Sequence, residues 1–415
     1  MREFTNNMEG SLSARHQESV LKWNVRVLTS GGLWPAGPPR LFAVFTTFVF
    51  VVKWTHILMA VRTLYLSWGD LNEITLTLLS MITMLGGAIK MTLFLKNRSV
   101  YYQLVQRLDD MVRYHEQYYV GNETMVSTFQ MARKKALRLT FITLGYLNVL
   151  GPLWFVMPLL EDTSEKHLPF IPMHGLNFTS IPLYELSYVT QCTATFFWHL
   201  VSVGLDMFYA SLMIHVTAQL TILNVRFTNL HLETDHLSCR SNLRPITAPF
   251  DNSVLTEAHS RMYRELCDLV RSHQKIIEFT TYLEDVMNST VLVQFLSSVL
   301  VACVTLFQAT INSAGNTVVK CWLYLPMPAF QIFVYCWCAH DLVDQGLEVC
   351  TSAFLSAWVE GSRHLRRGLL VVMARARRPL ELTAGRMHPI NRATFVSLIN
   401  ASYTYYAVLR RVNDR

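Results

Sequence analysis

The stretch VLVQFLSSVLVACVTLFQATIN, residues 291–312, contains no charged side chain. A helix needs about 20 mostly apolar residues to cross the hydrocarbon core of a bilayer, so this segment is long enough for one membrane span. The composition of the whole chain agrees. Of its 415 residues, 51% are hydrophobic and 16% are charged, whereas soluble domains carry about 25% charged residues. The sequence therefore predicts a membrane protein and excludes disordered, collagenous and coiled-coil classes.

Six further segments have the same apolar character, although the last of them is short for a span. They are Leu41–Val61, Glu73–Leu95, Leu139–Leu160, Leu186–Ile214, Cys321–Ala339 and Ala393–Leu409. We therefore expect an all-α membrane protein with seven transmembrane helices.

The basic residues indicate the orientation of these spans. Lys and Arg are concentrated in every second connection, namely 95–139, 215–275 and 363–386. The connections between them carry almost none. Because cytoplasmic loops are enriched in Lys and Arg, the pattern predicts an intracellular N-terminus and an extracellular C-terminus.

These assignments divide the chain into seven parts. They are a cytoplasmic N-terminus (1–40), spans one to four (41–216), cytoplasmic helices leading into the fifth span (217–290), spans five and six (291–345), a further cytoplasmic segment (346–390), the last helix (391–412) and an extracellular tail (413–415). The sequon at Asn177 lies in a loop expected outside, and it is the predicted glycosylation site.

The long connection before the fifth span has its own helical periodicity. The stripe consists of Met262, Leu266, Leu269, His273, Ile276 and Thr280. We expect helices over Ala218–His231 and Val254–Thr280, separated by a flexible loop at Ser238–Ser253. This part could be a solvated spacer or an assembly domain. We favour assembly, with Met262, Leu266, Leu269 and Ile276 between subunits, because an apolar stripe needs a partner that buries it.

Two features inside the spans allow more than one interpretation. Asp206 could pair with His199, Lys53 or Lys90, or it could contact a ligand. In the last helix, one face carries small and polar residues and ends in valine and arginine. Its members are Ser397, Ala401, Thr404, Val408 and Arg411, with Val412 beside them. Spacing alone does not decide between a pore-lining face and a face packed on neighbouring helices.

Several classes of function lack support in the sequence. It contains no Walker loop, GxSxG elbow, HExxH or kinase motif, so we expect no enzyme. The eight Cys residues lack zinc spacing, and we expect neither a metal nor a cofactor. The net charge of +7 is spread over clusters between apolar runs, which argues against nucleic-acid binding.

The C-terminal third carries a resemblance to a known family. It contains YCWCAHDLV (335–343), Trp358 and RGLLVVMARARRPLELTAGRMHPINRATFVSLINASYTYYAVLRR (367–411). The fourth span adds PLYELSYVTQ (182–191) and HVTAQLTIL (215–223). These segments resemble the signature of insect odorant receptors. Two departures are Ala339-His340, where the family often has Gly-Asn, and Asn400, where it often has Lys.

The resemblance implies an odorant-binding subunit of a heterotetrameric, ligand-gated, non-selective cation channel. Its partner would be the shared odorant receptor co-receptor, in the dendrite membrane of olfactory neurons. Extensions of helices four to seven would form a cytoplasmic anchor. An odorant pocket would lie in the outer half of the bilayer, and the last helix would line the pore. The alternative is a gustatory-type receptor that forms homotetramers, although its TYxxxxxQF ending is missing here.

Aromatic, methionine and weakly polar residues in the expected outer halves are the candidate pocket. They are Leu78, Met81, Trp154, Phe155, Tyr188, Gln191, Cys192, Phe196, Trp322 and Tyr324. Such a lining suits a small volatile ligand, which gains mainly from apolar burial. The candidate gate consists of Val408 and Val412, with Thr404 and Arg411 beside them. Four arginines in one ring would repel cations, so Arg411 argues for a minority share of this chain in the pore.

Overall fold

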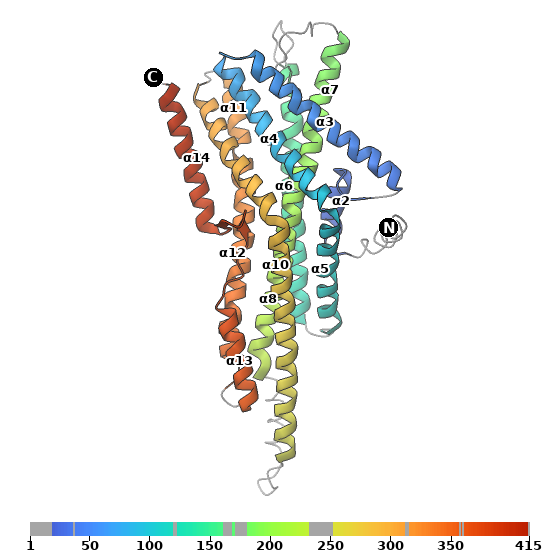
Figure 1. Ribbon diagram of the computed structural model, residues 1–415, viewed down its shortest axis with the longest axis vertical. Helices are drawn as coiled ribbons and strands as arrows, with labels where there is room; N and C mark the ends of the chain where they lie inside the picture. Colours follow the sequence, from blue (N-terminus) through green and yellow to red (C-terminus); the bar gives the residue numbers. More distant parts are fainter. Residues whose placement is uncertain are drawn as a thin grey trace.

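The computed structural model describes residues 19–35, 38–118, 123–160, 168–170, 181–231, 252–311, 315–356, 358 and 361–413. Within these residues the chain is almost entirely helical, and the long helices run side by side along an elongated bundle (Figure 1). Asn177 lies outside the described residues. So does the expected loop Ser238–Ser253, except for its last two residues, which begin a helix.

The first half of the chain forms five described helices. They are α2 (Lys22–Ser30), α3 (Pro39–Leu66), α4 (Leu71–Lys96), α5 (Arg98–Tyr118) and α6 (Glu123–Leu160). The α3–α4 turn is short, and the Asp70 side chain accepts hydrogen bonds from the backbone N–H groups of Asn72 and Glu73. This N-cap satisfies amides that the first turn of α4 leaves free, so the two helices run in opposite directions.

The second half contains the longest helix and the one hairpin of the described chain. Its elements are α7 (Ile181–Trp198), the π-helix η1 (His199–Val203), α8 (Gly204–Thr228), the 3₁₀ turn η2 (Asn229–His231), α10 (Asn252–Ile311), α11 (Gly315–Tyr324), α12 (Pro326–Leu355), α13 (Arg363–Ala376), β1 (Thr383–Ala384), β2 (His388–Pro389) and α14 (Arg392–Asn413). We call the two ends of the bundle the α11 end and the α13 end (Figure 1).

Six helical segments among the described residues are long and apolar enough to cross a membrane. They correspond to the expected spans one to six, and all six begin earlier than expected, whereas the third and the fifth end at Val156 and Ile311. The fourth runs from Leu183 to Thr228 and the fifth from Ser260 to Ile311. The seventh expected span is also a helix, α14, but it is not among the six. A seven-span count and the orientation of the chain therefore stay predictions.

Helix α8 occupies the centre of the bundle. It is buried along nearly its whole length, and it packs against α6, α10, α12 and α2. Helix α3, by contrast, exposes apolar side chains such as Val44 and Leu58 on the outside of the bundle. A lipid environment stabilises a bundle that carries its polar groups in the interior and apolar side chains on its outer surface.

The stripe expected between subunits lies in the core of this chain. Met262, Leu266, Leu269 and Ile276 are all buried within the single chain. Leu266 also packs against Gly368 of α13, where an added Cβ would lie 2.8 Å from its Cδ2 atom. The partner that covers the stripe is therefore the chain itself, and a contact between subunits needs other faces of these helices.

The hairpin β1–β2 is an element that the sequence did not predict. Thr383 pairs with Pro389 and Ala384 with His388. Gly385, which has a positive φ of 61°, makes the turn and packs so closely on Leu292 of α10 that an added Cβ would lie 2.6 Å away. The hairpin thus fixes the start of α14 against α10.

Candidate ligand site and buried polar network

A buried ion pair joins α4 to α8 in the middle of the bundle. Lys90 Nζ lies 2.5 Å from Asp206 Oδ1, and the two side chains are 0% and 1% exposed. Lys90 also donates to Ser202 Oγ at 3.3 Å. Of the residues considered as ion-pair partners of Asp206, Lys90 is the one that forms the pair. Lys53 is buried too, but no described residue forms a hydrogen bond with its Nζ.

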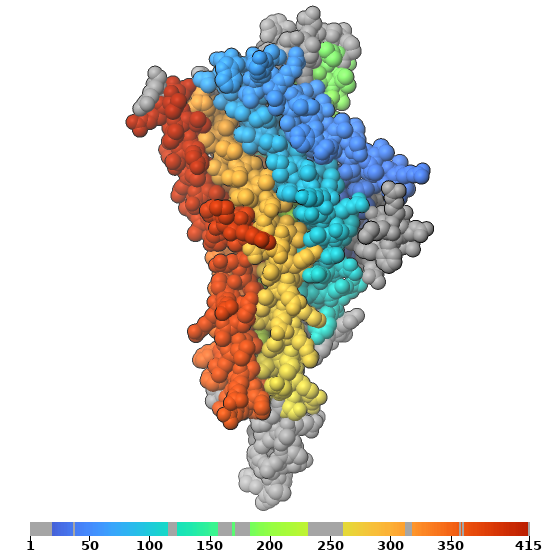
Figure 2. Space-filling view, viewed as in Figure 1, coloured from blue at the N-terminus to red at the C-terminus, as the bar shows by residue number. Residues whose placement is uncertain are grey.

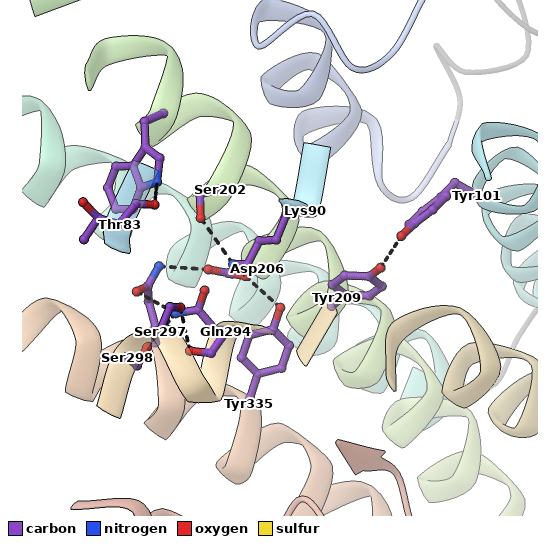
Figure 3. Close-up of polar contacts among 12 residues, drawn as sticks. Thr83, Lys90, Tyr101, Ser202, Asp206, Tyr209, Gln294, Ser297, Ser298 and Tyr335 are labelled. Carbon is purple, nitrogen blue, oxygen red and sulfur yellow. Dashed lines mark hydrogen bonds and ion pairs between the residues drawn. The ribbon is translucent and has the colours of Figure 1, made fainter. Parts of the chain in front are cut away.

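The Asp206 carboxylate is also bonded to α12. Tyr335 donates its phenolic O–H to Oδ1 at 2.8 Å, and Gln331 donates from Nε2 to Oδ2 at 2.9 Å. Gln294 of α10 donates in turn to Gln331 Oε1 at 2.9 Å (Figure 3). One carboxylate thus connects four helices, and its hydrogen bonds offset part of the cost of burying a charge.

A small cavity with a volume of about 20 Å³, which we call the chamber, lies beside this network; it has room for a group of about the size of a water molecule. Its walls come from α4, the end of α7, η1, α10, α11 and α12. The residues that line it are Thr83, Gly86, Gly87, Trp198, Ser202, Gln294, Ser297, Ser298, Val301, Tyr324, Met327, Pro328 and Gln331. Polar side chains of the network therefore form part of the chamber wall.

Close helix packing shapes the wall on the α4 side. A Cβ added to Gly87 would lie 2.5 Å from Trp198 Cδ1, so only glycine lets the indole approach. Trp198 Nε1 donates to the carbonyl oxygen of Thr83 at 2.7 Å. The π-helix η1 follows Trp198 directly, and single π turns inside helices are frequent at functional sites.

Five of the ten predicted pocket residues meet at the α11 end, around Phe170. The Trp154 ring stacks on Phe170 at 5.8 Å and meets the edge of Tyr324 at 6.0 Å. Phe155 packs edge-on against Phe170. Two polar contacts complete this aromatic cluster: Tyr188 donates its O–H to the carbonyl oxygen of Phe155, and the Phe170 N–H donates to Gln191 Oε1 at 3.1 Å.

The other five predicted residues are not part of this arrangement. Phe196 and Trp322 are exposed, and Phe196 packs on Phe197. Leu78, Met81 and Cys192 are half-buried. Their place in a pocket stays a prediction without support from the described contacts.

Sequence reasoning missed twelve of the thirteen chamber residues, Tyr324 being the exception. Two signals were available. The glycine pair Gly86-Gly87 stands inside an apolar run, where glycine often marks close backbone approach. Gln294 and Gln331 are polar residues inside expected spans, and such residues face the bundle interior.

The candidate gate residues share the free face of α14. Thr404, Val408, Arg411 and Val412 are all exposed, whereas Ser402 and Tyr406 are buried against the bundle. Figure 2 shows α14 along one edge of the molecule, beside α10. Gating by these residues stays a prediction.

Six long apolar helices define a multi-pass membrane protein. The described residues contain no group of His, Cys, Asp and Glu side chains that could hold a metal ion. Residues 70–403 match the model of a protein family that is described as 7tm Odorant receptor. The chain therefore belongs to this family, whose members are receptors.

Relatives and solved structures agree with this assignment. The chain is 24% identical to Odorant receptor 10 of Aedes albopictus, over 83% of this chain and 86% of the relative. It is 23% identical to Odorant receptor Or2 of Anopheles gambiae, over 84% and 87%. The fold is similar to that of the insect olfactory receptor OR5 from Machilis hrabei, with a TM-score of 0.73 and 21% identity over 94% of this chain and 97% of the other. That receptor has also been solved in complex with eugenol.

The buried ion pair generates a prediction about stability. Asp206→Asn should lower the free energy of unfolding by about 3–5 kcal/mol, because Lys90 is left as an unpaired buried charge. Lys90→Met should lower the free energy of unfolding by a similar amount. The double variant, in which neither charge is left unpaired, should recover part of this stability. The measurement is denaturant unfolding of the chain purified in detergent.

An exposed pair provides the matched control. Asp285 and Arg386 lie 2.7 Å apart and are 55% and 71% exposed, so Asp285→Asn should cost less than about 1 kcal/mol. Equal effects of the two Asp→Asn changes would show that burial of the Lys90–Asp206 pair does not determine stability.

Proposed function

We propose that this chain is the odorant-binding subunit of a ligand-gated, non-selective cation channel. It assembles with the shared odorant receptor co-receptor into a heterotetramer in the dendrite membrane of olfactory sensory neurons, with its N-terminus inside. Basic side chains support the orientation, because α13 at one end of the bundle carries four arginines within Arg363–Ala376.

The observation that carries this proposal is the internal chamber next to the aromatic cluster. Tyr324 belongs to both, since it lines the chamber and contacts Trp154. The chamber and the aromatic cluster beside it offer apolar and aromatic surface between helices, and small-molecule sites are concave and mostly apolar. A volatile ligand would gain most of its binding free energy by leaving water.

Recording in oocytes tests this function. The chain expressed with the co-receptor should give inward current when small volatile compounds are applied, and the chain alone should give none. Trp154→Ala should shift the dose–response curve to higher concentration by about tenfold, because it removes an aromatic contact with both Phe170 and Tyr324.

The controls concern expression and the alternative function. Trp68→Ala, which changes an exposed tryptophan outside the cluster and outside the candidate pocket, should leave the curve in place at equal surface expression. Current from the chain alone would support the gustatory-type homotetramer instead. Silence in all combinations, with the chain at the cell surface, would refute the channel.

Assembly requires a surface that the single chain leaves uncovered. Near the α13 end such a surface consists of exposed apolar side chains on α12 and α13. Its members are Leu347, Phe354, Leu355, Leu370 and Val371. Exposed apolar patches commonly mark protein interfaces, and these residues lie on the helices expected to form the anchor. We assign this surface to the contact with a neighbouring subunit.

Two substitutions separate assembly from folding. Val371→Asp changes a side chain that is 70% exposed, so the chain should fold normally while its co-purification with the co-receptor falls. Leu269→Asp puts a charge at a position that is 0% exposed, so the folded chain itself should be lost. Size-exclusion profiles and pull-down yields give both readouts. Normal co-purification of Val371→Asp would place the subunit contact elsewhere.

Helix α14 is the proposed pore helix. Val408 and Val412 would form this subunit's part of a hydrophobic constriction, because apolar rings can gate by excluding water. Thr404 would lie below them, and the long stem of Arg411 would turn its charge toward outer water. The exposure of all four side chains in the single chain supports a face that is completed by other subunits.

The gate predicts opposite effects for two substitutions on this face. Val408→Ser should raise the current without odorant several-fold, because a hydroxyl lowers the cost of wetting the constriction. Arg411→Gln should change the reversal potential or conductance modestly while leaving odorant potency intact. Recordings of basal current and reversal potential check both. A silent Val408→Ser channel, together with unaltered permeation in Arg411→Gln, would remove this face from the pore.

A further inference from the structure

Part of the chamber wall is polar although the span segments around it are apolar. Four buried side chains form it, and we call them the polar recess. They are Ser202 of η1, Gln294 and Ser298 of α10, and Gln331 of α12. Buried polar groups in a bundle interior are costly unless they are bonded, so each of their hydrogen-bonding atoms needs a partner.

The hydrogen bonds of the recess leave specific atoms available. Gln294 Nε2 donates both of its protons, one to Ser298 Oγ at 2.7 Å and one to Gln331 Oε1 at 2.9 Å. No described residue donates to Gln294 Oε1. Ser298 and Ser202 both act as acceptors, from Gln294 and Lys90, so their hydroxyl protons are free for another acceptor. The recess thus combines one acceptor with two donors.

The orientation of these groups is set by the ion pair behind them. Asp206 Oδ2 accepts from Gln331 Nε2 at 2.9 Å, which turns Gln331 Oε1 toward Gln294. That oxygen in turn holds the nitrogen of Gln294, so the carbonyl oxygen of Gln294 is the atom left for the chamber. Figure 3 shows Gln294, Ser297 and Ser298 grouped beside Asp206. Binding groups that are held in place before the ligand arrives lose little entropy on binding.

Apolar side chains form another part of the chamber wall. Trp198, Val301 and Met327 belong to it, and Tyr324 connects the chamber to the aromatic cluster. A ligand that fits both parts has an apolar body and one small polar group at its end.

We propose that the polar recess binds the hydroxyl group of a small apolar alcohol. The hydroxyl donates to Gln294 Oε1 and accepts from Ser202 or Ser298. An ether or carbonyl oxygen can only accept, so it leaves Gln294 Oε1 without a donor. This inference rests on the function proposed above, because it names the chemical class of the ligand for the same internal site.

The experiment compares isomeric ligands on three channels. Primary alcohols of five to nine carbons and their isomeric methyl ethers are applied to the unaltered chain with the co-receptor, to Gln294→Leu and to Ser298→Ala. The alcohols should be more potent than the ethers by about tenfold or more, because a site built around a hydroxyl discriminates against analogues that lack it. Gln294→Leu should lose this preference while ether potency stays within about threefold. Ser298→Ala removes a donor that alcohols and ethers can both use, so it should leave the preference in place.

Ser297→Ala is the matched control. Ser297 also lines the chamber, but its hydroxyl donates to the backbone carbonyl of Gln294 at 3.0 Å. Its removal should therefore preserve the alcohol preference. Surface labelling of each variant confirms equal expression, and Gln294→Met, which also removes the acceptor but is closer to glutamine in length, should lose the preference if Gln294→Leu is poorly expressed.

The outcomes separate this inference from the proposed function. Equal potencies of alcohols and ethers on the unaltered channel would overturn the hydroxyl site, with water filling the recess, and would leave the receptor function intact. A parallel loss of both potencies in Gln294→Leu would also overturn it, because the residue would then act on the fold or the gate. No current with any volatile compound would refute the receptor function and the site together.

Discussion

The ion pair between Lys90 and Asp206 is the constraint on which the centre of this bundle depends. Each charge would cost several kcal/mol if it were buried without compensation, so the two side chains must meet wherever the helices pack. Asp206 also needs Tyr335 and Gln331, and it therefore fixes the axial position of α12 relative to α8. Apolar contacts in a membrane interior tolerate sliding of one helix along another, whereas this set of directional bonds does not. The packing of α4, α8, α12 and α10 follows from it.

The π-helix η1 is what allows one face of α7–α8 to meet α4 over two turns. Trp198, Ser202 and Asp206 are spaced by four residues, and all three bond to α4. In a regular α-helix of 3.6 residues per turn, a spacing of four rotates each next side chain by about 40°. The wider π turn rotates the chain less per residue, which opposes this drift. The π-helix thus keeps the side chains of Trp198, Ser202 and Asp206 directed at α4. The first two of them also line the chamber.

The sequence predicted the helices well because their signal is local. Apolar runs determine the spans, and the stripe at Met262–Ile276 correctly indicated a helix that continues into the fifth span. It did not identify what buries the stripe, since α13 is brought there by the chain path. The hairpin at Thr383–Pro389 was missed because its strands are two residues long. Chamber residues such as Gln294 and Gln331 were missed for another reason. Periodicity places them in the interior, but their meeting depends on the axial positions that Asp206 fixes.

The outer surfaces of the bundle differ in what they require. Helix α3 exposes Val44, Leu58 and other apolar side chains, for which lipid tails are a sufficient neighbour. Helix α14 is different, because its exposed face combines Val408 with Arg411, and lipid tails offer no partner to a guanidinium. The hydroxyl of Thr404 on this face donates to the backbone carbonyl of Asn400 at 2.9 Å. Water alone is also a poor neighbour, since Val408 and Val412 share that face. A mixed face of this kind is satisfied where water and protein meet, as along a narrow aqueous path between subunits. The mixed face of α14 supports the pore proposed above, on the same physical grounds by which the apolar surface of α3 suits lipid.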